Sequence, residues 1–182
     1  MNLMKAVLIV LALTISACAY VKIALSVDNS ITAEDEQAII SLGVEKECEN
    51  TDRIYVNEVG CLNSIQIAVQ SIGEKSCAVA KDIIEPPEFL RRGYGCCFDR
   101  ARFIEKAARY YGYATRHVFL IQITKAGFLS NFLPLGQGSH ATSEVLTSKG
   151  WLGIDSNEPF ILMAKDGSPY TYRDAIDNLN EF

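Results

Sequence analysis

The 182-residue chain has little positive charge. It carries 17 lysines and arginines against 22 aspartates and glutamates, which gives a net charge of −5. The basic residues form no cluster along the sequence, whereas binding to nucleic-acid phosphates needs a basic face. Internal repeats and low-complexity segments are also absent. We therefore expect one folded domain with short accessory segments, and no nucleic-acid partner.

The usual spacings of metal and cofactor sites are missing as well. The six cysteines include no pair separated by two residues, and the adjacent Cys96 and Cys97 cannot easily face one metal ion. Acidic residues are scattered rather than spaced as a calcium loop. No cofactor-binding signature is present. We expect neither a metal nor a cofactor.

The longest apolar run lies near the N-terminus. Residues 6–15 are apolar or weakly polar and follow a short basic start, but a membrane span needs about 20 residues. Small residues and Cys18 come next, which is the layout of a secretory signal. We expect residues 1–18 to be a signal peptide, a lipoprotein signal or an anchor, and residues 19–31 to form a tether.

Three interpretations of this N-terminus stay open. Residues 15–18 resemble a bacterial lipobox, in which the cysteine, here Cys18, is lipidated. Apolar residues continue as far as Leu25, so an uncleaved anchor is the second interpretation, and soluble secretion is the third. All three predict an exported protein. The first two tether it to a membrane by lipid or anchor, facing the periplasm or the cell exterior.

An oxidising location makes disulfides plausible. If Cys18 carries lipid and Cys97 is a free thiol, four cysteines remain, and they allow three connectivities between which the sequence does not choose. These four are Cys48, Cys61, Cys77 and Cys96.

Apolar periodicity predicts an α+β fold in which helices precede strands. Helices are expected over residues 32–43, with Thr32 as N-cap, and over residues 62–84 and 96–111. The sequence Glu85-Pro86-Pro87 is expected to stop the second helix. Strands are expected over residues 117–123, 140–147 and 151–155, with residues 124–139 as a loop over a site.

Cys97 lies at the expected start of the third helix, directly after the turn residues Gly93-Tyr94-Gly95. Unpaired N–H groups and the positive end of the helix dipole favour the nucleophilic thiolate there, and they can stabilise an oxyanion. Cys97, rather than Cys96, shares the apolar stripe of that helix. We assign Tyr94 and Cys96 to the surrounding pocket. The alternative is that Cys97 is a small buried apolar residue or half of a disulfide.

His140 opens the second expected strand, and the chain has only two histidines. If Ser148 and Lys149 are the turn residues of a hairpin, His140 and Asp155 lie on one face as diagonal neighbours. Their Cα atoms are then about 7–8 Å apart. An aspartate that orients the imidazole is what a Cys–His pair requires. A turn one residue longer or shorter would place Asp155 on the opposite face.

Four elements in this order resemble the motifs of the transglutaminase-like cysteine enzymes. They are Gly95-x-Cys97, the segment 112–116, His140-Ala141 with Glu144-Val145, and Trp151-x-x-x-Asp155. The resemblance covers about residues 86–159 of a domain expected over residues 32–182. It implies a papain-like core, in which a helix bearing the cysteine packs on an antiparallel sheet bearing the histidine and the aspartate.

The resemblance also implies roles. Cys97 would be the nucleophile, His140 the general base and acid, and Asp155 the orienting carboxylate. Arg116 matches the family's arginine and is expected to form a structural ion pair. His117 matches no family position, so we expect a structural role. Thr142 stands where the family usually has an aromatic residue.

The expected activity is cleavage or transfer of an acyl group at an amide bond. Water as acceptor makes the protein a peptidase or amidase, which we favour slightly, and an amine makes it a transamidase. The substrate would be a peptide or protein, for example a cell-wall peptide. One alternative is a non-catalytic binding module stapled by disulfides. Another is an acyltransferase resembling the arylamine N-acetyltransferases, which are longer chains.

Overall fold

The computed structural model describes residues 5, 11–12, 14–16, 27–49, 52–77, 84–121 and 139–178. Most of the expected signal segment, Cys18, the start of the tether and the expected loop up to residue 138 lie outside these residues. Within them, no helix is long and apolar enough to span a bilayer. The described part has a mixed α+β fold, which confirms the predicted class.

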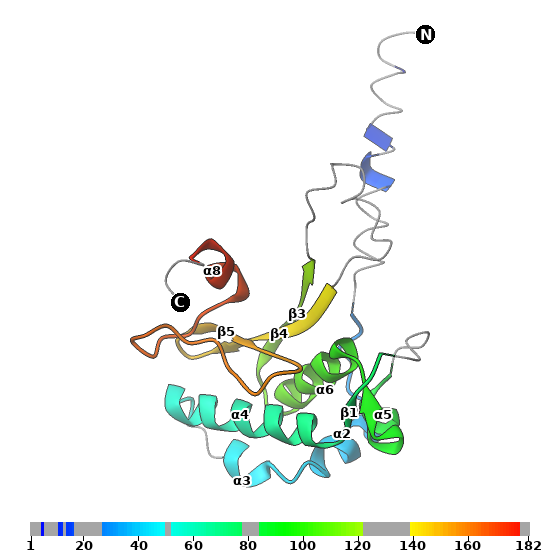
Figure 1. The fold of residues 1–182 in the computed structure, drawn as a ribbon, viewed down its shortest axis with the longest axis vertical. Coiled ribbons are helices and arrows are strands. Elements are labelled where there is room, and N and C mark those ends of the chain that lie inside the picture. The colour runs from blue at the N-terminus through cyan, green and yellow to red at the C-terminus, as the bar shows by residue number, and fades with distance from the viewer. Residues whose placement is uncertain are drawn as a thin grey trace.

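Six helices and five strands carry the described architecture (Figure 1). The helices are α2 (Ala33–Ile40), α3 (Glu45–Cys48), α4 (Tyr55–Ser71), α5 (Pro86–Arg92), α6 (Cys97–Tyr110) and α8 (Tyr172–Asp177). The strands are β1 (Glu74–Lys75), β2 (Tyr94–Gly95), β3 (Ala114–Ile121), β4 (Ser139–Thr147) and β5 (Gly150–Ile154).

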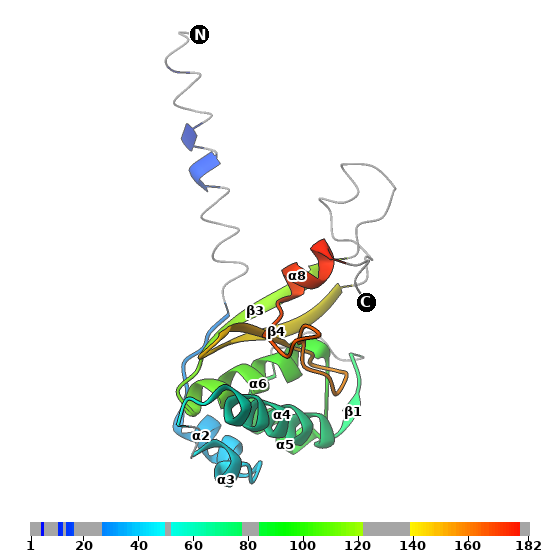
Figure 2. The same cartoon turned by 90° about the vertical axis from the view of Figure 1, so that its left-hand side faces the viewer.

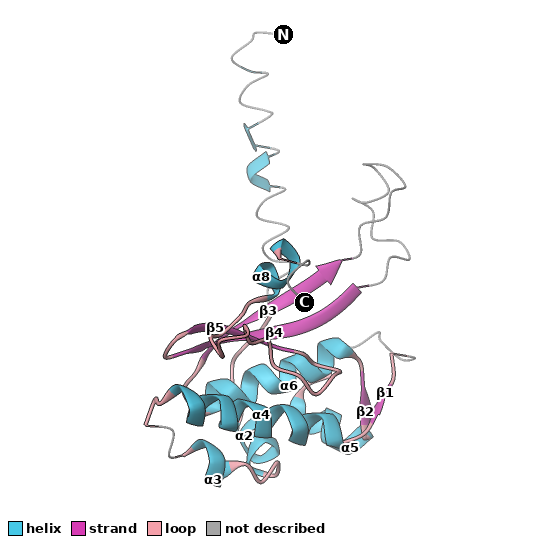
Figure 3. Cartoon of the chain, turned by 60° about the vertical axis from the view of Figure 1, so that its left-hand side comes forward, coloured by secondary structure: helices cyan, strands magenta, loops and turns pink. Residues whose placement is uncertain are grey.

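A three-stranded antiparallel sheet in the order β3-β4-β5 divides the fold into two sides. Helices α4 and α6 lie on one side, and the short α8 lies on the other (Figures 1 and 2). Strands β1 and β2 form a separate parallel pair near α5 (Figure 3). Helix α6 covers one face of the sheet, where it packs against β3 and β4.

Helix α6 is buried on all sides over most of its length. Every residue from Asp99 to Ala108 is buried, and the helix contacts α2, α4, α5 and the sheet. A helix with a solvated polar face can leave its charges in water, but a fully enclosed helix must pair them. The charged residues of α6 therefore determine which neighbours can pack against it.

Lys106 is the clearest case of such pairing. Its Nζ lies 2.7 Å from Asp35 of α2 and 2.6 Å from Glu85, the residue before α5. Arg102, one turn earlier on α6, bonds the same Glu85 at 2.6 Å. Asp35 also closes the capping box with the expected N-cap Thr32. One ionic cluster thus joins the start of α2, the start of α5 and the middle of α6.

The predicted bounds of the second helix are wrong at both ends. Helix α4 begins at Tyr55, after Asp52 and Arg53 adopt positive φ angles of 40° and 52°. It ends at Ser71, because the chain at Gly73 crosses the backbone of Gly93. A Cβ at Gly73 would lie 1.6 Å from the Gly93 carbonyl oxygen, so only glycine fits there.

The prolines after Glu85 do not follow a helix but begin one. Pro86 is the first residue of α5, where its missing N–H leaves no hydrogen bond unmade. Strands β3, β4 and β5 lie close to their predicted positions, although β3 starts at Ala114 rather than at His117. The prediction missed α3, α5, α8 and the β1–β2 pair, which are all short.

Two disulfides select one of the three connectivities that the sequence left open. Cys48 is bonded to Cys61, which joins α3 to α4, and Cys77 is bonded to Cys96 at the start of α6. Cys97 is a free thiol. Cys97 therefore lies outside the two bridges, which use the four cysteines expected to remain if Cys97 is a free thiol.

The Lys106–Asp35 contact gives a stability prediction with a defined pH dependence. We expect Asp35→Asn to lower the free energy of unfolding near neutral pH by about 2–3 kcal/mol. This is less than the full penalty for orphaning a buried charge, because Glu85 still contacts Lys106. Burial acts to raise the pKa of Asp35, but hydrogen bonds from Lys106 and Thr32 outweigh it and hold that pKa below its usual 3.8.

A lowered pKa in the folded state means that the stabilisation is present above the unfolded pKa and is lost as the pH falls through the folded value. The difference between wild type and Asp35→Asn should therefore shrink in acid. Urea denaturation near neutral pH and in acid measures it. Glu34→Gln removes an exposed carboxylate from the same helix, and it should stay within about 0.5 kcal/mol of wild type. Equal losses for both variants would contradict the prediction.

Candidate functional site

The start of α6 is fixed by contacts on both sides of Cys97. Cys96 is the N-cap, and Cys97 is the first helical residue. The buried Asp99 carboxylate accepts hydrogen bonds from the amides of Cys96, at 2.8 Å, and Ile84, at 3.3 Å. Burial raises the pKa of Asp99, although these two amides act to lower it. Gly95 is required before the turn, because a Cβ there would lie 2.1 Å from the Phe89 ring.

The Cys97 thiol lies against the backbone of β4. Its sulfur accepts a hydrogen bond from the amide of Ala141, with a distance of 3.4 Å from N to Sγ. Strand β5 ends at Ile154, opposite Ser143, and so does not reach Ala141. The carbonyl of Ala141 accepts a hydrogen bond from the hydroxyl of Ser156 at 2.6 Å. The thiol thus occupies a pairing position that the sheet leaves open, next to His140.

His140 and Asp155 are hydrogen-bonded, with 2.8 Å between Nε2 and Oδ2. The register that produces this contact is the predicted one: Thr147 pairs with Gly150, so the hairpin turns at residues 148–149. The carboxylate of Asp155 is buried, whereas the side chain of His140 is 30% exposed. Because Nε2 is engaged, the nitrogen left for another partner is Nδ1.

The Asp155 carboxylate accepts four hydrogen bonds. Oδ1 accepts from the amides of Asn157 and Glu158, both at 2.8 Å. Oδ2 accepts from His140 and, at 3.3 Å, from the hydroxyl of Tyr172. Four donors of fixed direction hold the carboxylate in one orientation, and with it the ring of His140.

Gln66 of α4 fixes the backbone of the same loop from below the sheet. This fully buried side chain places its amide nitrogen 2.8 Å from the Asp155 carbonyl oxygen, 3.0 Å from that of Glu158 and 2.8 Å from that of Phe160. Gln70, one turn later, adds further contacts to the first two. The sequence analysis missed Gln66. Its one signal was a polar residue beside an apolar stripe.

Tyr172 and Thr142 complete the surroundings of Asp155 on the α8 side of the sheet. The Thr142 hydroxyl lies 2.6 Å from the Tyr172 hydroxyl and 2.5 Å from the Ile154 carbonyl oxygen. Burial, together with the charge of Asp155, raises the pKa of Tyr172, although the hydrogen bond from Thr142 acts to lower it. Tyr172 is therefore a neutral phenol that donates to Asp155. The sequence analysis missed it, because α8 was not predicted.

Arg116 makes the expected ion pair, and His117, for which only a structural role was expected, is buried between α6 and the sheet. Arg116 forms an ion pair with Glu144 and lies over the ring of Trp151, 4.3 Å from its centroid. His117 is buried, and its Nδ1 lies 2.8 Å from Glu105 of α6. The His117 ring also contacts two phenylalanines, Phe98 and Phe119, of which Phe98 directly follows the candidate nucleophile.

The two residues assigned to the pocket, Tyr94 and Cys96, make no described contact with Cys97, His140 or Asp155 through a side-chain hydrogen bond. Cys96 is half of a disulfide with Cys77, so it has no thiol to offer the site. Tyr94 lies in β2, paired with Glu74, and no described hydrogen bond joins its side chain to Cys97. Three of the predicted site residues, Cys97, His140 and Asp155, are thus brought to one end of the sheet.

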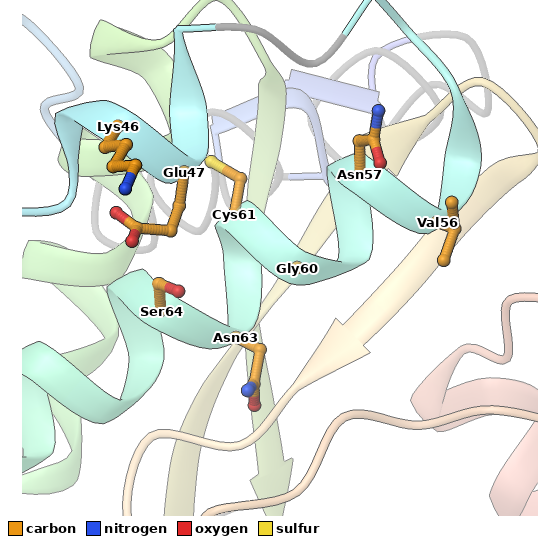
Figure 4. Close-up of a pocket in the computed structure, with 8 residues that line it drawn as sticks. All are labelled: Lys46, Glu47, Val56, Asn57, Gly60, Cys61, Asn63 and Ser64. Atoms are coloured by element: carbon orange, nitrogen blue, oxygen red, sulfur yellow. The ribbon is translucent and has the colours of Figure 1, made fainter.

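A cavity of about 490 Å³ lies elsewhere, between α3 and α4 (Figure 4). It is lined by Lys46, Glu47, Val56, Asn57, Gly60, Cys61, Asn63 and Ser64. None of the triad residues lines it. Its lining comes from α3 and α4 and mixes charged, polar and apolar residues.

Among the described residues, no group of three or more histidines, cysteines or acidic side chains is arranged to hold a metal ion. The chain matches no protein-family model, no curated protein and no solved structure.

The Gln66 contacts give a second stability prediction. Gln66→Leu keeps the volume approximately and removes the donor to three carbonyl groups, of which that of Asp155 is the most enclosed. We expect the free energy of unfolding to fall by about 1–3 kcal/mol, the usual cost of leaving buried acceptors unpaired. Chemical denaturation measures it. Gln37→Leu, at an exposed position of α2, is the control, and a loss as large in the control would contradict the assigned role.

Proposed function

We propose that this chain is a transglutaminase-like thiol enzyme that acts on amide bonds through Cys97, His140 and Asp155. The observation that carries the proposal is the 2.8 Å hydrogen bond from Nε2 of His140 to Asp155, beside the residue whose amide contacts the free thiol of Cys97. A Cys, a His and an orienting carboxylate at the end of one sheet are the parts that nucleophilic acyl transfer needs.

The proposed reaction divides the work among the three residues. Cys97 gives its thiol proton to His140, and Sγ attacks the amide carbonyl carbon. His140 passes that proton to the departing amine, and the C–N bond breaks to leave a thioester. Water then attacks the thioester, His140 accepts its proton, and the carboxylic acid leaves as the thiol is restored. An amine in place of water yields a new amide instead. Asp155 keeps the imidazole oriented and stabilises its charged form.

The arrangement of helix and sheet supports a papain-like core for this chemistry. Helix α6 begins with Cys97 and packs on β3 and β4, and the Cys97 thiol contacts the residue after His140, so the N-terminus of the helix lies near His140. First-turn N–H groups of a helix can stabilise the oxyanion of a tetrahedral intermediate. The two disulfides support an oxidising, extracytoplasmic location. There we propose a membrane tether through Cys18 lipid or an N-terminal anchor, and a peptide or protein substrate such as a cell-wall peptide.

The first test is the reactivity of the thiol. Iodoacetamide should alkylate Cys97 near neutral pH at least about tenfold faster than it alkylates a free cysteine derivative, because the thiolate is the reactive form. His140→Ala should slow the reaction by about tenfold or more, since the thiol then loses its base. Mass spectrometry of the labelled peptides measures both rates, and Cys97→Ser is the blank.

The contrary results are equally specific. Slow labelling at the same rate in wild type and in His140→Ala would contradict the proposal that the protein is an enzyme. A disulfide at Cys97 in the purified protein would do so too. Either result would favour the alternative of a non-catalytic binding module held together by disulfides.

The second test identifies the acyl acceptor. Incubation with a glutamine-containing peptide and a primary amine, followed by mass spectrometry, separates the acid from the new amide. We expect the acid to predominate and Cys97→Ala to abolish both products. Asp155→Asn should lower the rate by about 10²–10⁴-fold, because an amide donates a proton to the imidazole instead of accepting one. Full activity in Cys97→Ala would refute the assignment.

A further inference from the structure

We propose that Tyr172 is a positioning residue of this site, whose phenol holds the Asp155 carboxylate and thereby sets the charge that His140 experiences. The inference rests on the proposed function of Cys97, His140 and Asp155. It adds the C-terminal helix α8 to the working parts of the site.

The two donors to Asp155 Oδ2 are the basis of the inference. His140 Nε2 lies 2.8 Å from this oxygen, and the Tyr172 hydroxyl lies 3.3 Å from it. The Tyr172 hydroxyl also lies 2.6 Å from the Thr142 hydroxyl, which in turn lies 2.5 Å from the carbonyl oxygen of Ile154. The two hydroxyl groups and the Asp155 carboxylate therefore form one hydrogen-bonded network, which ends on the oxygen that His140 also uses.

Contacts on three sides fix the position of the Tyr172 side chain, which is buried. Its backbone amide donates to Glu144 of β4 at 2.8 Å, and Glu144 is itself paired with Arg116. Gly153 of β5 lies beside the ring: an added Cβ there would lie 2.6 Å from the Leu162 side chain and 3.1 Å from the ring edge of Tyr172, so glycine leaves room for both side chains.

Thr142 explains why the ring comes from α8. Thr142 stands where the transglutaminase-like motif usually carries an aromatic residue, and it is fully buried. Its small side chain leaves room for the Tyr172 ring, and its hydroxyl bonds to the phenol. The departure from the motif is thus matched by an aromatic side chain from elsewhere in the chain.

The hydroxyl has an electrostatic consequence as well as a steric one. A donor at Oδ2 takes up part of the carboxylate charge that would otherwise act on His140 alone. Without it, the imidazolium is stabilised more strongly and persists to higher pH. The titratable groups packed around Tyr172 are Asp155, His140, Glu144 with its partner Arg116, and Asp174, which caps Thr171.

The test compares the pH dependence of Cys97 alkylation by iodoacetate in full-length variants, from about pH 5 to pH 9, a range that covers histidine titration. This reagent is an anion, so its rate falls on the alkaline side when the imidazolium that attracts it loses its proton. Tyr172→Phe keeps the ring and removes the hydroxyl. We expect the pH at which the rate falls to half its maximum on the alkaline side to rise by about half a unit. The rate at the optimum should fall by about three- to tenfold, because the carboxylate is less well oriented.

Two matched comparisons separate this role from a loss of structure. Tyr170→Phe removes a hydroxyl from the same segment, but that hydroxyl lies 2.9 Å from the Asn178 amide nitrogen, so the profile should match wild type. Thr142→Ser keeps the hydroxyl beside Tyr172 and should also match wild type.

The outcomes are distinct. A fall of the Tyr172→Phe rate by the same factor at every pH, or a profile equal to wild type, would overturn the positioning role while His140→Ala still slows wild-type labelling. Labelling that does not respond to His140→Ala would overturn the proposed function, and with it this inference. A shifted alkaline limb in Tyr172→Phe alone among the two tyrosine variants supports the inference.

Discussion

The enclosure of α6 is the constraint on which the other elements depend. Every residue from Asp99 to Ala108 is buried, so the charges of this helix are removed from water and each needs a partner within the fold. Lys106 and Arg102 meet this need with carboxylates at the starts of α2 and α5. Glu105, on another side, meets it with His117 and Ser143 of the sheet. The ionic contacts therefore specify the orientation of α6, which apolar packing alone would leave less defined.

Because α6 is held in this way, its first residue arrives at a fixed place. Cys97 reaches the backbone of β4 where β5 has already ended, and the strand amide that lacks a ladder partner bonds to the thiol. The same departure of the chain from the sheet after Ile154 carries Asp155 to His140. Strand β5 ends opposite Ser143 and so does not reach the first residues of β4. This one feature of the sheet creates both the place of the thiol and the His–Asp contact.

How far the sequence predicted this arrangement depends on the range of each interaction. The His140–Asp155 contact was predictable, because a two-residue turn fixes every pairing of a hairpin and side chains alternate with period two. The helix of Cys97 was predictable from its apolar stripe and preceding glycines. Gln66 and Tyr172 were not, since each reaches Asp155 from an element far away in sequence. Neither local periodicity nor spacing carries information about such contacts.

The predicted bounds of α4 were wrong for a related reason. Residues 74–84 continue an apolar spacing that suits a helix, but Gly73 is needed where two backbones cross, and a strand pairing follows it. That requirement arises from Gly93, distant in sequence, and overrides local propensity. The same local rearrangement places Cys77 beside Cys96. In an oxidising environment, a free Cys96 thiol could form a disulfide with a partner of Cys97 or with Cys97 itself. The bond between Cys96 and Cys77 prevents this. The short β1–β2 pairing and the chemistry proposed for Cys97 therefore depend on the same crossing of the chain.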